Sequence, residues 1–421
     1  MDEEQLEQLY TLFLNSTGVV TDSRKVESGS LFFALRGDKF DGNNYAVQAL
    51  NMGASAAVID APQILEANPD FADRLLLVED TLVALQALAR EHRRALAVPI
   101  IAIVGSNGKT TTKELVSRVL AERFELTTTR GNLNNHIGVP LTLLDMDSTT
   151  EFAVVEMGAS AQREIALLCS IAEPNYGIIT NIGRSHLEGF GGVEGIRKGK
   201  GELFDFLAEN GGRAFVPQED EVLVAMAAER ETMATEYYSR EVANGFESHL
   251  VGDYNRYNIA AAVKVGRYFD IDDRHIGEAI LSFMPDNNRS QAVTTERNRL
   301  IVDCYNANPS SMAVALENVA SVDAERKLLI LGDMLELGEW SAEEHSTILR
   351  QADALGAELY LVGGEFGAAY ESLRGELHSK CHTFASAEEV KSALSAQPVE
   401  GALVLIKGSR GIALERVVES L

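Results

Sequence analysis

A glycine turn that carries a lysine and threonines follows the apolar run Ile100–Val104, and these residue types together can bind a nucleotide. The β-branched run predicts a buried strand, and Gly105 and Gly108 allow a sharp turn, because glycine enters positive φ without steric cost. Lys109 and Thr110 would then begin a helix, whose unpaired backbone N–H groups bind phosphate well. The lysine adds a full positive charge, and the threonine hydroxyl can ligate Mg²⁺. The stretch therefore predicts a site for nucleotide phosphates and Mg²⁺.

The spacing of these glycines differs from the general phosphate-loop pattern, which places four residues between them. Only Ser106 and Asn107 separate the glycines here. The simpler interpretation is a strand-to-helix turn of an α/β protein that binds no phosphate. Because Gly-Lys-Thr-Thr directly follows an apolar strand, we favour the phosphate-binding interpretation.

Two further side chains are predicted at the ends of strands in the same region. Glu156 ends the apolar run Phe152–Glu156, and His186 stands in a glycine-rich segment after the apolar residues 176–182. In open α/β sheets, ligands bind beyond the carboxyl ends of the strands. We therefore expect both side chains at the edge that carries the phosphate loop, where Glu156 can reach a bound metal ion. A single histidine is usually structural or exposed, but a strand-end position favours a metal ligand.

Polar segments elsewhere are candidates for substrate contacts, and each also has a simpler interpretation. Asn134 and Asn135 lie in an asparagine-rich segment, residues 129–140, which forms either a turn-rich connection or a hydrogen-bonding surface. Lys200 belongs to a basic cluster that begins at Arg197. That cluster is either a solvated helix face or, in so acidic a chain, a contact for an anionic ligand.

Three more candidates depend on local context. Asn255 and Asn258 enter an alanine-rich helix and either cap it or recognise a base. Arg24 follows Asp22 and Ser23 in a predicted loop, where it is a candidate for a phosphate contact.

Composition restricts the classes of function. The chain has 421 residues, of which 46% are apolar and 24% charged, and its net charge is -26. So acidic a surface repels nucleic acid and anionic membranes, and we expect neither as a partner. Cys169, Cys304 and Cys381 stand far apart, which predicts neither a zinc site nor a disulfide framework. The chain has no run of about 18 apolar residues and begins without a signal-peptide pattern. We therefore expect a cytoplasmic protein, by default a monomer.

The alternation of strand and helix patterns predicts an α/β protein of three domains. Residues 1–97 predict a small N-terminal α/β domain. Residues 98–289 predict a central, mostly parallel sheet of the phosphate-loop ATPase type. Residues 290–421 predict a third, Rossmann-like α/β domain without the Gly-x-Gly-x-x-Gly motif. Pro99 and the polar residues 284–290 indicate the two boundaries.

In this order, the segments resemble the Mur ligase family, the ATP-dependent amide-forming enzymes of peptidoglycan assembly. The resemblance covers essentially the whole chain. The short phosphate loop, residues 105–110, matches the loop of that family, which explains its departure from the general pattern. Five further side chains fall where the family motifs stand: Glu156, His186, Asn258, Arg289 and Asp303.

The segments that distinguish members of the family lie in the C-terminal third of the chain. Residues 303–309 read Asp-Cys-Tyr-Asn-Ala-Asn-Pro, residues 331–338 read Leu-Gly-Asp-Met-Leu-Glu-Leu-Gly, and residues 407–409 read Lys-Gly-Ser. They resemble the member that adds D-alanyl-D-alanine to UDP-N-acetylmuramoyl-tripeptide. The resemblance implies these two substrates, ATP and Mg²⁺. It also implies an acyl-phosphate intermediate, formed when the tripeptide carboxylate attacks ATP.

The resemblance also implies a role for each site residue. Lys109, Lys200 and His186 would be catalytic, with Lys200 carbamylated by CO₂. The carbamate, Thr110, Glu156 and His186 would organise the Mg²⁺ ions. The residues implied for ATP binding are Gly105, Ser106, Asn107, Gly108, Lys109, Thr110, Thr111, Asn258, Arg289 and Asp303. The residues implied for substrate binding are Ser23, Arg24, Asn134, Asn135, Asn306 and Asn308.

Two positions depart from the family pattern, and three other functions stay open. Tyr254 and Asn43 each stand where the family usually has histidine. One alternative is a sister Mur ligase that adds a single amino acid, and another is a ligase like folylpolyglutamate synthase. The N-terminal residues 21–59 argue against the latter, which would have no separate uridine domain. The third is a phosphate-loop switch or motor, for which no switch-like loop or arginine finger is identifiable. The third residue of the tripeptide, lysine or diaminopimelate, also stays open.

Overall fold

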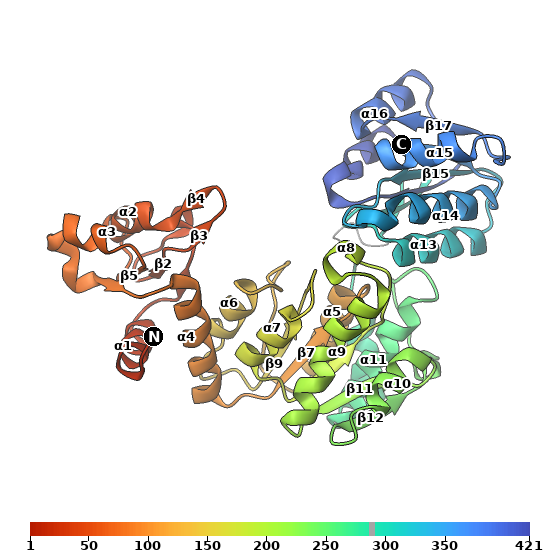
Figure 1. Cartoon of the computed structure of the whole chain (residues 1–421). Coiled ribbons are helices and arrows are strands. Elements are labelled where there is room, and N and C mark those ends of the chain that lie inside the picture. Colours follow the sequence, from red (N-terminus) through yellow and green to blue (C-terminus); the bar gives the residue numbers. More distant parts are fainter. Residues whose placement is uncertain (286–290) are drawn as a thin grey trace.

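The computed structural model describes residues 1–285 and 291–421, in which three mostly parallel sheets follow one another along the chain (Figure 1). The first sheet is parallel, with the strand order β1-β2-β5-β6. Its strands are β1 (Val19–Val20), β2 (Leu31–Phe33), β5 (Ala56–Ile59) and β6 (Leu75–Leu77). A separate hairpin pairs β3 (Arg36–Gly37) with β4 (Phe40–Asp41). The helices of this region are α1 (Glu3–Leu14), α2 (Ala46–Asn51), α3 (Pro62–Ala67) and α4 (Thr81–Leu96).

The second sheet has six parallel strands in the order β12-β11-β10-β7-β9-β8. They are β7 (Ile100–Val104), β8 (Leu126–Thr128), β9 (Phe152–Glu156), β10 (Tyr176–Ile179), β11 (Arg213–Pro217) and β12 (Ala234–Tyr238). One face packs on α6 (Gly138–Leu144), α7 (Glu164–Ala172), α9 (Val193–Glu209) and α10 (Glu221–Ala228). The other face packs on α5 (Lys109–Leu120), α11 (Asn255–Tyr268) and α12 (Asp273–Leu281). The apolar strands β7 and β9 are buried throughout because helices cover both faces.

The order of these strands explains where a ligand can bind. After β7 the chain turns to α5 on one face, whereas after the neighbouring strands β9 and β10 it turns to helices on the other face. Connections that diverge in this way open a crevice at the carboxyl ends of the strands. The phosphate loop follows β7 and lies at this crevice.

The third sheet has the order β13-β14-β18-β15-β16-β17, in which only β13 is antiparallel to its neighbour. Its strands are β13 (Gln291–Thr294), β14 (Arg299–Asp303), β15 (Lys327–Gly332), β16 (Glu358–Val362), β17 (Cys381–Phe384) and β18 (Leu403–Lys407). One face packs on α13 (Pro309–Ser321), α14 (Ser341–Asp353) and α15 (Gly364–Leu373). The other face packs on α16 (Ala387–Ala396) and the 3-10 helix η7 (Leu414–Ser420). The short helix α8 (Leu187–Phe190) of the central region contacts the cluster that includes α13 and α14.

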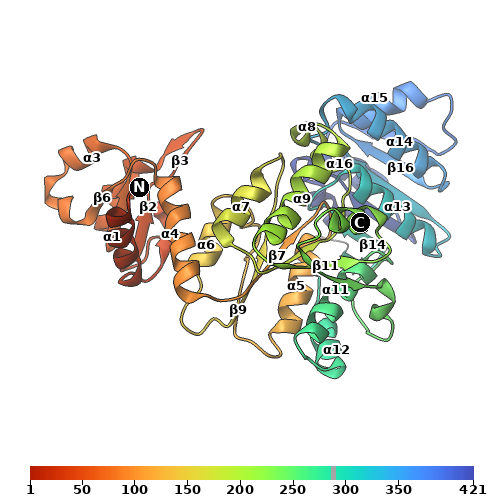
Figure 2. The ribbon, with the colours of Figure 1, turned by 60° about the horizontal axis from the view of Figure 1, so that its bottom comes forward.

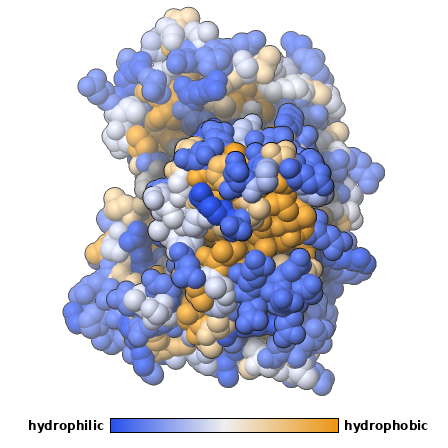
Figure 3. Space-filling view, turned by 90° about the vertical axis from the view of Figure 1, so that its left-hand side faces the viewer, coloured by the Kyte–Doolittle hydropathy of each residue, from blue (hydrophilic) through white to orange (hydrophobic). Residues whose placement is uncertain are grey.

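Helix α4 connects the N-terminal and central regions and packs on both, as the two ribbon views show (Figures 1 and 2). Its buried His92 contacts the carbonyl of Met146 at 2.8 Å. The buried Arg93 donates hydrogen bonds to the carbonyls of Ala172 and Glu173 at 3.0 Å each. These contacts attach α4 to the central region. Hydrophilic side chains dominate the face seen from the N-terminal end, around hydrophobic patches (Figure 3).

The predicted three-domain α/β fold is confirmed, while the boundaries at residues 97 and 289 stay predictions. Strand β2 ends at Phe33, because the chain then leaves the sheet towards the β3–β4 hairpin. The sequence patterns did not predict short or polar strands such as β8 and β12. Arg289 lies outside the described residues. No helix of the described ranges is long and apolar enough to cross a membrane.

Candidate functional site

A cavity of about 1200 Å³ lies between the central sheet and the C-terminal sheet. The phosphate loop and the residues that follow β9, β10 and β11 line one side of it, together with the start of α11. The residues that follow β14 and the start of α13 line the other side. The cavity thus joins the carboxyl ends of strands from two sheets, where α/β proteins bind ligands.

The phosphate loop is packed so closely that a side chain at either of its glycines would clash with a neighbour. Gly105 has φ of 148°, and a Cβ atom there would lie 1.9 Å from the Thr180 hydroxyl. Gly108 has φ of 80°, and a Cβ atom there would lie 2.8 Å from the side-chain oxygen of Asn258. Thr180 also donates a hydrogen bond to the Asn107 carbonyl at 2.6 Å, which fixes the loop. The backbone of α5 begins immediately after this loop and can bind phosphate.

Two lysines meet beneath the loop. Lys109 Nζ donates to the Gly105 carbonyl at 2.8 Å, and Lys200 Nζ donates to the same carbonyl at 3.2 Å. Lys200 is only 1% exposed. Burial, with a smaller contribution from the Lys109 ammonium, lowers the pKa of Lys200 well below its ordinary value. A larger fraction of Lys200 is therefore a neutral amine than in an exposed lysine.

The side chains predicted to bind Mg²⁺ present oxygen atoms that fit a hard cation. Glu156 is 2% exposed, and its Oε1 accepts a hydrogen bond from Asn134 at 2.8 Å. Its Oε2 and the Thr110 hydroxyl are buried and lack hydrogen-bond partners among the residues that the structure describes. Orphaned buried oxygens are costly unless a ligand satisfies them. The described residues contain no cluster of three or more His, Cys, Asp and Glu side chains that could hold a metal alone.

His186 lies on the cavity wall but contacts the opposite region of the chain. Its Nδ1 pairs with the Glu336 carboxylate, and this contact lowers the pKa of Glu336. The loop that carries His186 makes a second ion pair through Arg184 with the buried Glu344. The backbone of Arg184 also donates to the Ser310 hydroxyl at 2.8 Å. The predicted metal ligand therefore also belongs to the contact between the central and C-terminal sheets.

The phosphate loop itself contacts the C-terminal sheet region through two asparagine side chains. Asn308 Nδ2 donates to Asn107 Oδ1 at 2.8 Å, and Asn107 Nδ2 lies 3.5 Å from Asn308 Oδ1. Asn308 also caps α13, because its side chain accepts from the Ser311 amide at 2.9 Å. Asn306 lines the same wall.

Asp303 and Lys407 form an ion pair across adjacent strands of the C-terminal sheet. Lys407 Nζ donates to Asp303 Oδ2 at 2.5 Å and to the Asn306 carbonyl at 3.1 Å. Lys407 is buried and lines the cavity. Lys407 therefore binds one oxygen of the Asp303 carboxylate, which the family resemblance assigns to ribose binding.

The end of the cavity at α11 is lined by aromatic and amide side chains. Asn258 accepts a hydrogen bond from Thr112 at 3.1 Å and donates to Asn255 at 2.8 Å. It therefore supports the phosphate loop from below. Tyr254 lines the cavity, and so does Tyr257, which the sequence interpretation did not single out. No sequence pattern marked Tyr257, because its position depends on how α11 packs.

Asn134 and Asn135 lie on the cavity wall in different roles. The amide of Asn134 contacts Glu156, as described above. Asn135 accepts from the backbone of Ile137 and Gly138 at 3.1 and 2.9 Å, which shapes the start of α6. The asparagine-rich segment is thus both a connection with local capping bonds and part of the cavity.

Ser23 and Arg24 lie in the short 3-10 helix η1 (Ser23–Lys25) of the N-terminal region and do not line the cavity. The Arg24 side chain is 85% exposed and pairs with Asp22 at 2.8 Å. This hydrogen bond lowers the pKa of Asp22 to about 2. A ligand that touches both Arg24 and the cavity must be long.

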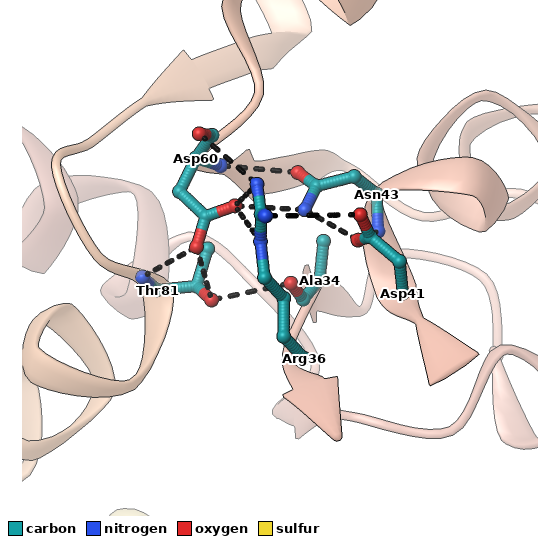
Figure 4. A network of polar contacts seen from close by, with 6 residues as sticks. All are labelled: Ala34, Arg36, Asp41, Asn43, Asp60 and Thr81. Atoms are coloured by element: carbon teal, nitrogen blue, oxygen red, sulfur yellow. Dashed lines mark hydrogen bonds and ion pairs between the residues drawn. The ribbon is translucent and has the colours of Figure 1, made fainter. Parts of the chain in front are cut away.

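Asn43 is 2% exposed and belongs to a hydrogen-bond network around Asp60 (Figure 4). Its amide nitrogen donates to Asp41 at 2.7 Å and to Asp60 at 2.8 Å, and its oxygen accepts from the Asp60 amide at 3.0 Å. Asp60 also binds Arg36 and Thr81. Burial raises the pKa of Asp60, but the hydrogen bonds from Asn43 and Arg36 outweigh it and hold the pKa below its ordinary value. Asn43 therefore has a structural role in place of the family histidine.

We expect Asn43→Ala to lower the free energy of unfolding by about 2–4 kcal/mol, because it leaves buried carboxylate and amide groups unpaired. Urea unfolding monitored by circular dichroism measures this change. The matched control is Asn44→Ala, since Asn44 is the exposed neighbour, and it should change the value by less than about 0.5 kcal/mol. Equal effects of the two substitutions would contradict the structural role of Asn43.

Three family models together match most of the chain. They are described as "Mur ligase family, catalytic domain" for residues 15–93, "Mur ligase middle domain" for residues 103–244, and "Mur ligase, glutamate ligase domain" for residues 288–410.

The chain is also similar to proteins of known function along nearly its full length. It is 34% identical to UDP-N-acetylmuramoyl-tripeptide--D-alanyl-D-alanine ligase of Bacillus subtilis, over 96% of this chain and 93% of that protein. It is 32% identical to the protein of the same name from Escherichia coli, again over 96% and 93%.

Solved structures agree with these similarities. A crystal structure of MurF from Acinetobacter baumannii superposes with a TM-score of 0.84 at 28% identity, over 99% of this chain and 98% of that one. MurF ligase from Thermotoga maritima, solved in complex with ADP, superposes with a TM-score of 0.81 at 26% identity, over 97% of each chain.

Proposed function

Because the chain belongs to the Mur ligase family, we propose that it joins D-alanyl-D-alanine to the terminal carboxylate of UDP-N-acetylmuramoyl-tripeptide. It is an ATP-dependent, ADP-forming ligase of peptidoglycan precursor synthesis. The relatives with this name and their solved structures favour this substrate pair over the sister reactions. We further propose that it acts in the cytoplasm, where ATP is available, and as a monomer.

The main support for the proposal is the contact between Asn107 and Asn308. Asn107 belongs to the phosphate loop, and Asn308 begins the helix that lines the opposite cavity wall. An acyl phosphate formed at the loop would therefore lie beside the wall from which the acceptor amine attacks. Such proximity accounts for much of the rate enhancement in phosphoryl and acyl transfer.

The proposed reaction has two steps. A carboxylate oxygen of the tripeptide attacks the γ-phosphorus of ATP, and the bond to the ADP oxygen breaks. The amine of D-alanyl-D-alanine then attacks the acyl carbon, loses a proton, and displaces inorganic phosphate. Lys109 and the backbone of α5 stabilise the charge that develops on the phosphate oxygens.

Mg²⁺ is proposed at the orphaned oxygens of Thr110 and Glu156, where it would neutralise phosphate charge. His186 could bind a second ion through Nε2 while its Nδ1 keeps the contact with Glu336. The lowered pKa of Lys200 supports its proposed carbamylation, because CO₂ reacts with the neutral amine. The carbamate would turn a buried cation beside the metal site into an anion.

We propose substrate contacts for the remaining side chains that the family resemblance singled out. Asn134 and Asn135 are proposed to face the muramoyl peptide, and Asn306 and Asn308 to face the acceptor dipeptide. Asn258, Asp303 and Arg289 are proposed for ATP. Ser23 and Arg24 are proposed to bind the UDP end of this long substrate.

A single assay tests the proposed function. Purified protein is mixed with ATP, Mg²⁺, UDP-N-acetylmuramoyl-tripeptide and D-alanyl-D-alanine, and phosphate and pentapeptide are measured. We expect one pentapeptide for each phosphate, with both products absent when the dipeptide is omitted. Phosphate release that does not depend on the dipeptide, without pentapeptide, would contradict the proposal.

Parallel reactions separate the alternatives. A sister ligase would instead use a shorter muramoyl peptide and a single amino acid, and a ligase like folylpolyglutamate synthase would extend folate with glutamate. Running the assay with lysine-containing and diaminopimelate-containing tripeptides also determines the third residue of the natural substrate.

A further inference from the structure

The carboxyl ends of β14 and β18 form a second crevice, adjoining the cavity. After β14 the chain turns to α13 on one face of the sheet, whereas after β18 it turns to η7 on the other face. Neighbouring strands with diverging connections are the usual position of a ligand in such sheets. Asp303 and Lys407 end these two strands, and Arg410 follows a few residues later.

The cations near this crevice differ in whether a carboxylate neutralises them. Lys407 is paired with Asp303, and Arg184 is paired with Glu344. Arg410 instead lies with its guanidinium carbon 5.4 Å from the ring centre of Tyr305. Its positive charge has no carboxylate partner within residues 1–285 and 291–421. Tyr305 lines the cavity, and Arg410 is an exposed residue that lies beside this ring.

We propose that Arg410 binds the terminal carboxylate of the incoming D-alanyl-D-alanine. This inference rests on the proposed function and deepens it, because it names the group that selects a free carboxylate at the end of the acceptor. The planar guanidinium can bind a carboxylate through two parallel hydrogen bonds. The contact with the Tyr305 ring favours this position of the guanidinium, and Arg410 is exposed and so accessible to a ligand.

The dimensions of this wall fit a dipeptide. The backbone from Tyr305 to Asn308 spans at most about 10 Å, and an extended dipeptide spans about 7 Å. Asn308 contacts the phosphate loop, and Tyr305 lies under Arg410. A dipeptide whose carboxylate binds Arg410 can therefore direct its amine towards the loop, where the acyl phosphate would form.

Ser409 is a positioning residue for Arg410. It is buried, and its hydroxyl accepts from the Leu335 amide at 2.9 Å. Its backbone amide donates to the Asp333 carbonyl at 3.1 Å. These bonds attach the segment that carries Arg410 to the end of β15, so the arginine has a rigid base.

The test compares two acceptors that differ only in the terminal charge: D-alanyl-D-alanine and its neutral C-terminal amide. For the wild-type enzyme we expect the KM of the amide to be about 10- to 100-fold higher, because the charged hydrogen bonds are lost. In Arg410→Ala, the KM of the dipeptide should rise by the same factor, and the two acceptors should differ by less than about threefold. Arg410→Lys should keep part of the preference, since it retains the charge without the planar fork.

Arg374→Ala is the matched control, because Arg374 is an exposed arginine over the ring of Tyr370 in the same sheet region. It should keep the wild-type KM for both acceptors. Wild-type preference for the free carboxylate in Arg410→Ala would overturn the inference and leave the proposed function standing. A wild-type enzyme that makes no pentapeptide would contradict the proposed function, and this inference with it. Circular dichroism and the KM for ATP verify that each variant is folded.

Discussion

Lys200→Ala is expected to lower kcat by about 10²- to 10³-fold, and short carboxylic acids added to the buffer should restore part of the activity. The physical reason is the buried position of the Lys200 amine, which shares the Gly105 carbonyl with Lys109. A charged ammonium there would repel both Lys109 and Mg²⁺, whereas a carbamate would attract them. A small carboxylic acid can enter the space left by the truncated side chain and replace that negative charge.

Two controls distinguish this loss of activity from a loss of structure. Lys198→Ala removes an exposed lysine of the same helix and should keep wild-type activity. Lys200→Met should be at least as stable as the unmodified wild type at pH 7, since it removes a buried amine. Full activity in Lys200→Ala, or no rescue by any small acid, would contradict the carbamate role.

The lowered pKa of Lys200 also predicts the direction of the pH dependence. In the pH range between its lowered folded pKa and the ordinary lysine value, the unfolded chain binds a proton that the folded chain does not. Stability therefore rises with pH across this range, and the rise should be absent in Lys200→Met. Activity should fall as acid protonates the amine, and bicarbonate should move that fall to lower pH. ¹³C-bicarbonate labelling detects the carbamate directly.

Glu156→Gln is expected to lower kcat by about 10²- to 10³-fold and to abolish saturable Mn²⁺ binding in the presence of ADP. Glu156 offers a buried carboxylate oxygen without a partner in the described chain, close to the phosphate loop in the same cavity. The amide has nearly the same shape but lacks the charge that a divalent cation requires. Electron paramagnetic resonance of Mn²⁺ measures binding independently of turnover.

Glu221→Gln is the control for this prediction, because Glu221 lines the same cavity but lies at the start of α10. It should leave Mn²⁺ binding unchanged. Tight Mn²⁺ binding by Glu156→Gln, equal to that of the wild type, would remove Glu156 from the metal site.

The sequence alone was sufficient to predict the features that depend on contiguous residues. The apolar run before Gly105, the turn and the start of α5 form a strand, a turn and a helix because each of these structures depends on neighbouring residues. The alternation of such segments predicted the three-domain α/β fold. The residues at several separated motifs resemble those of the Mur ligase family, and this resemblance identified the family.

The basic cluster at residues 197–200 shows where sequence patterns became ambiguous. The two interpretations of this cluster, a solvated helix face and part of the site, each apply to a different residue. Arg197 pairs with Glu229 on the surface, whereas Lys200 is buried beneath the phosphate loop. Helical periodicity separates the two faces of α9, but only packing determines which face meets the site.

Only the tertiary structure decided which charges are available for chemistry. Asn107 and Asn308 are 201 residues apart in the chain, yet they join the phosphate loop to the opposite wall of the cavity. Asp303 is paired with Lys407, whereas Arg410 lies over the ring of Tyr305 and has no carboxylate partner among the described residues. Hydrogen bonds and pKa values depend on burial and on the nearest polar groups, which the topology of three sheets brings together. The sequence therefore determined the local elements and the family, and long-range packing decided the protonation and the partners of the residues that act.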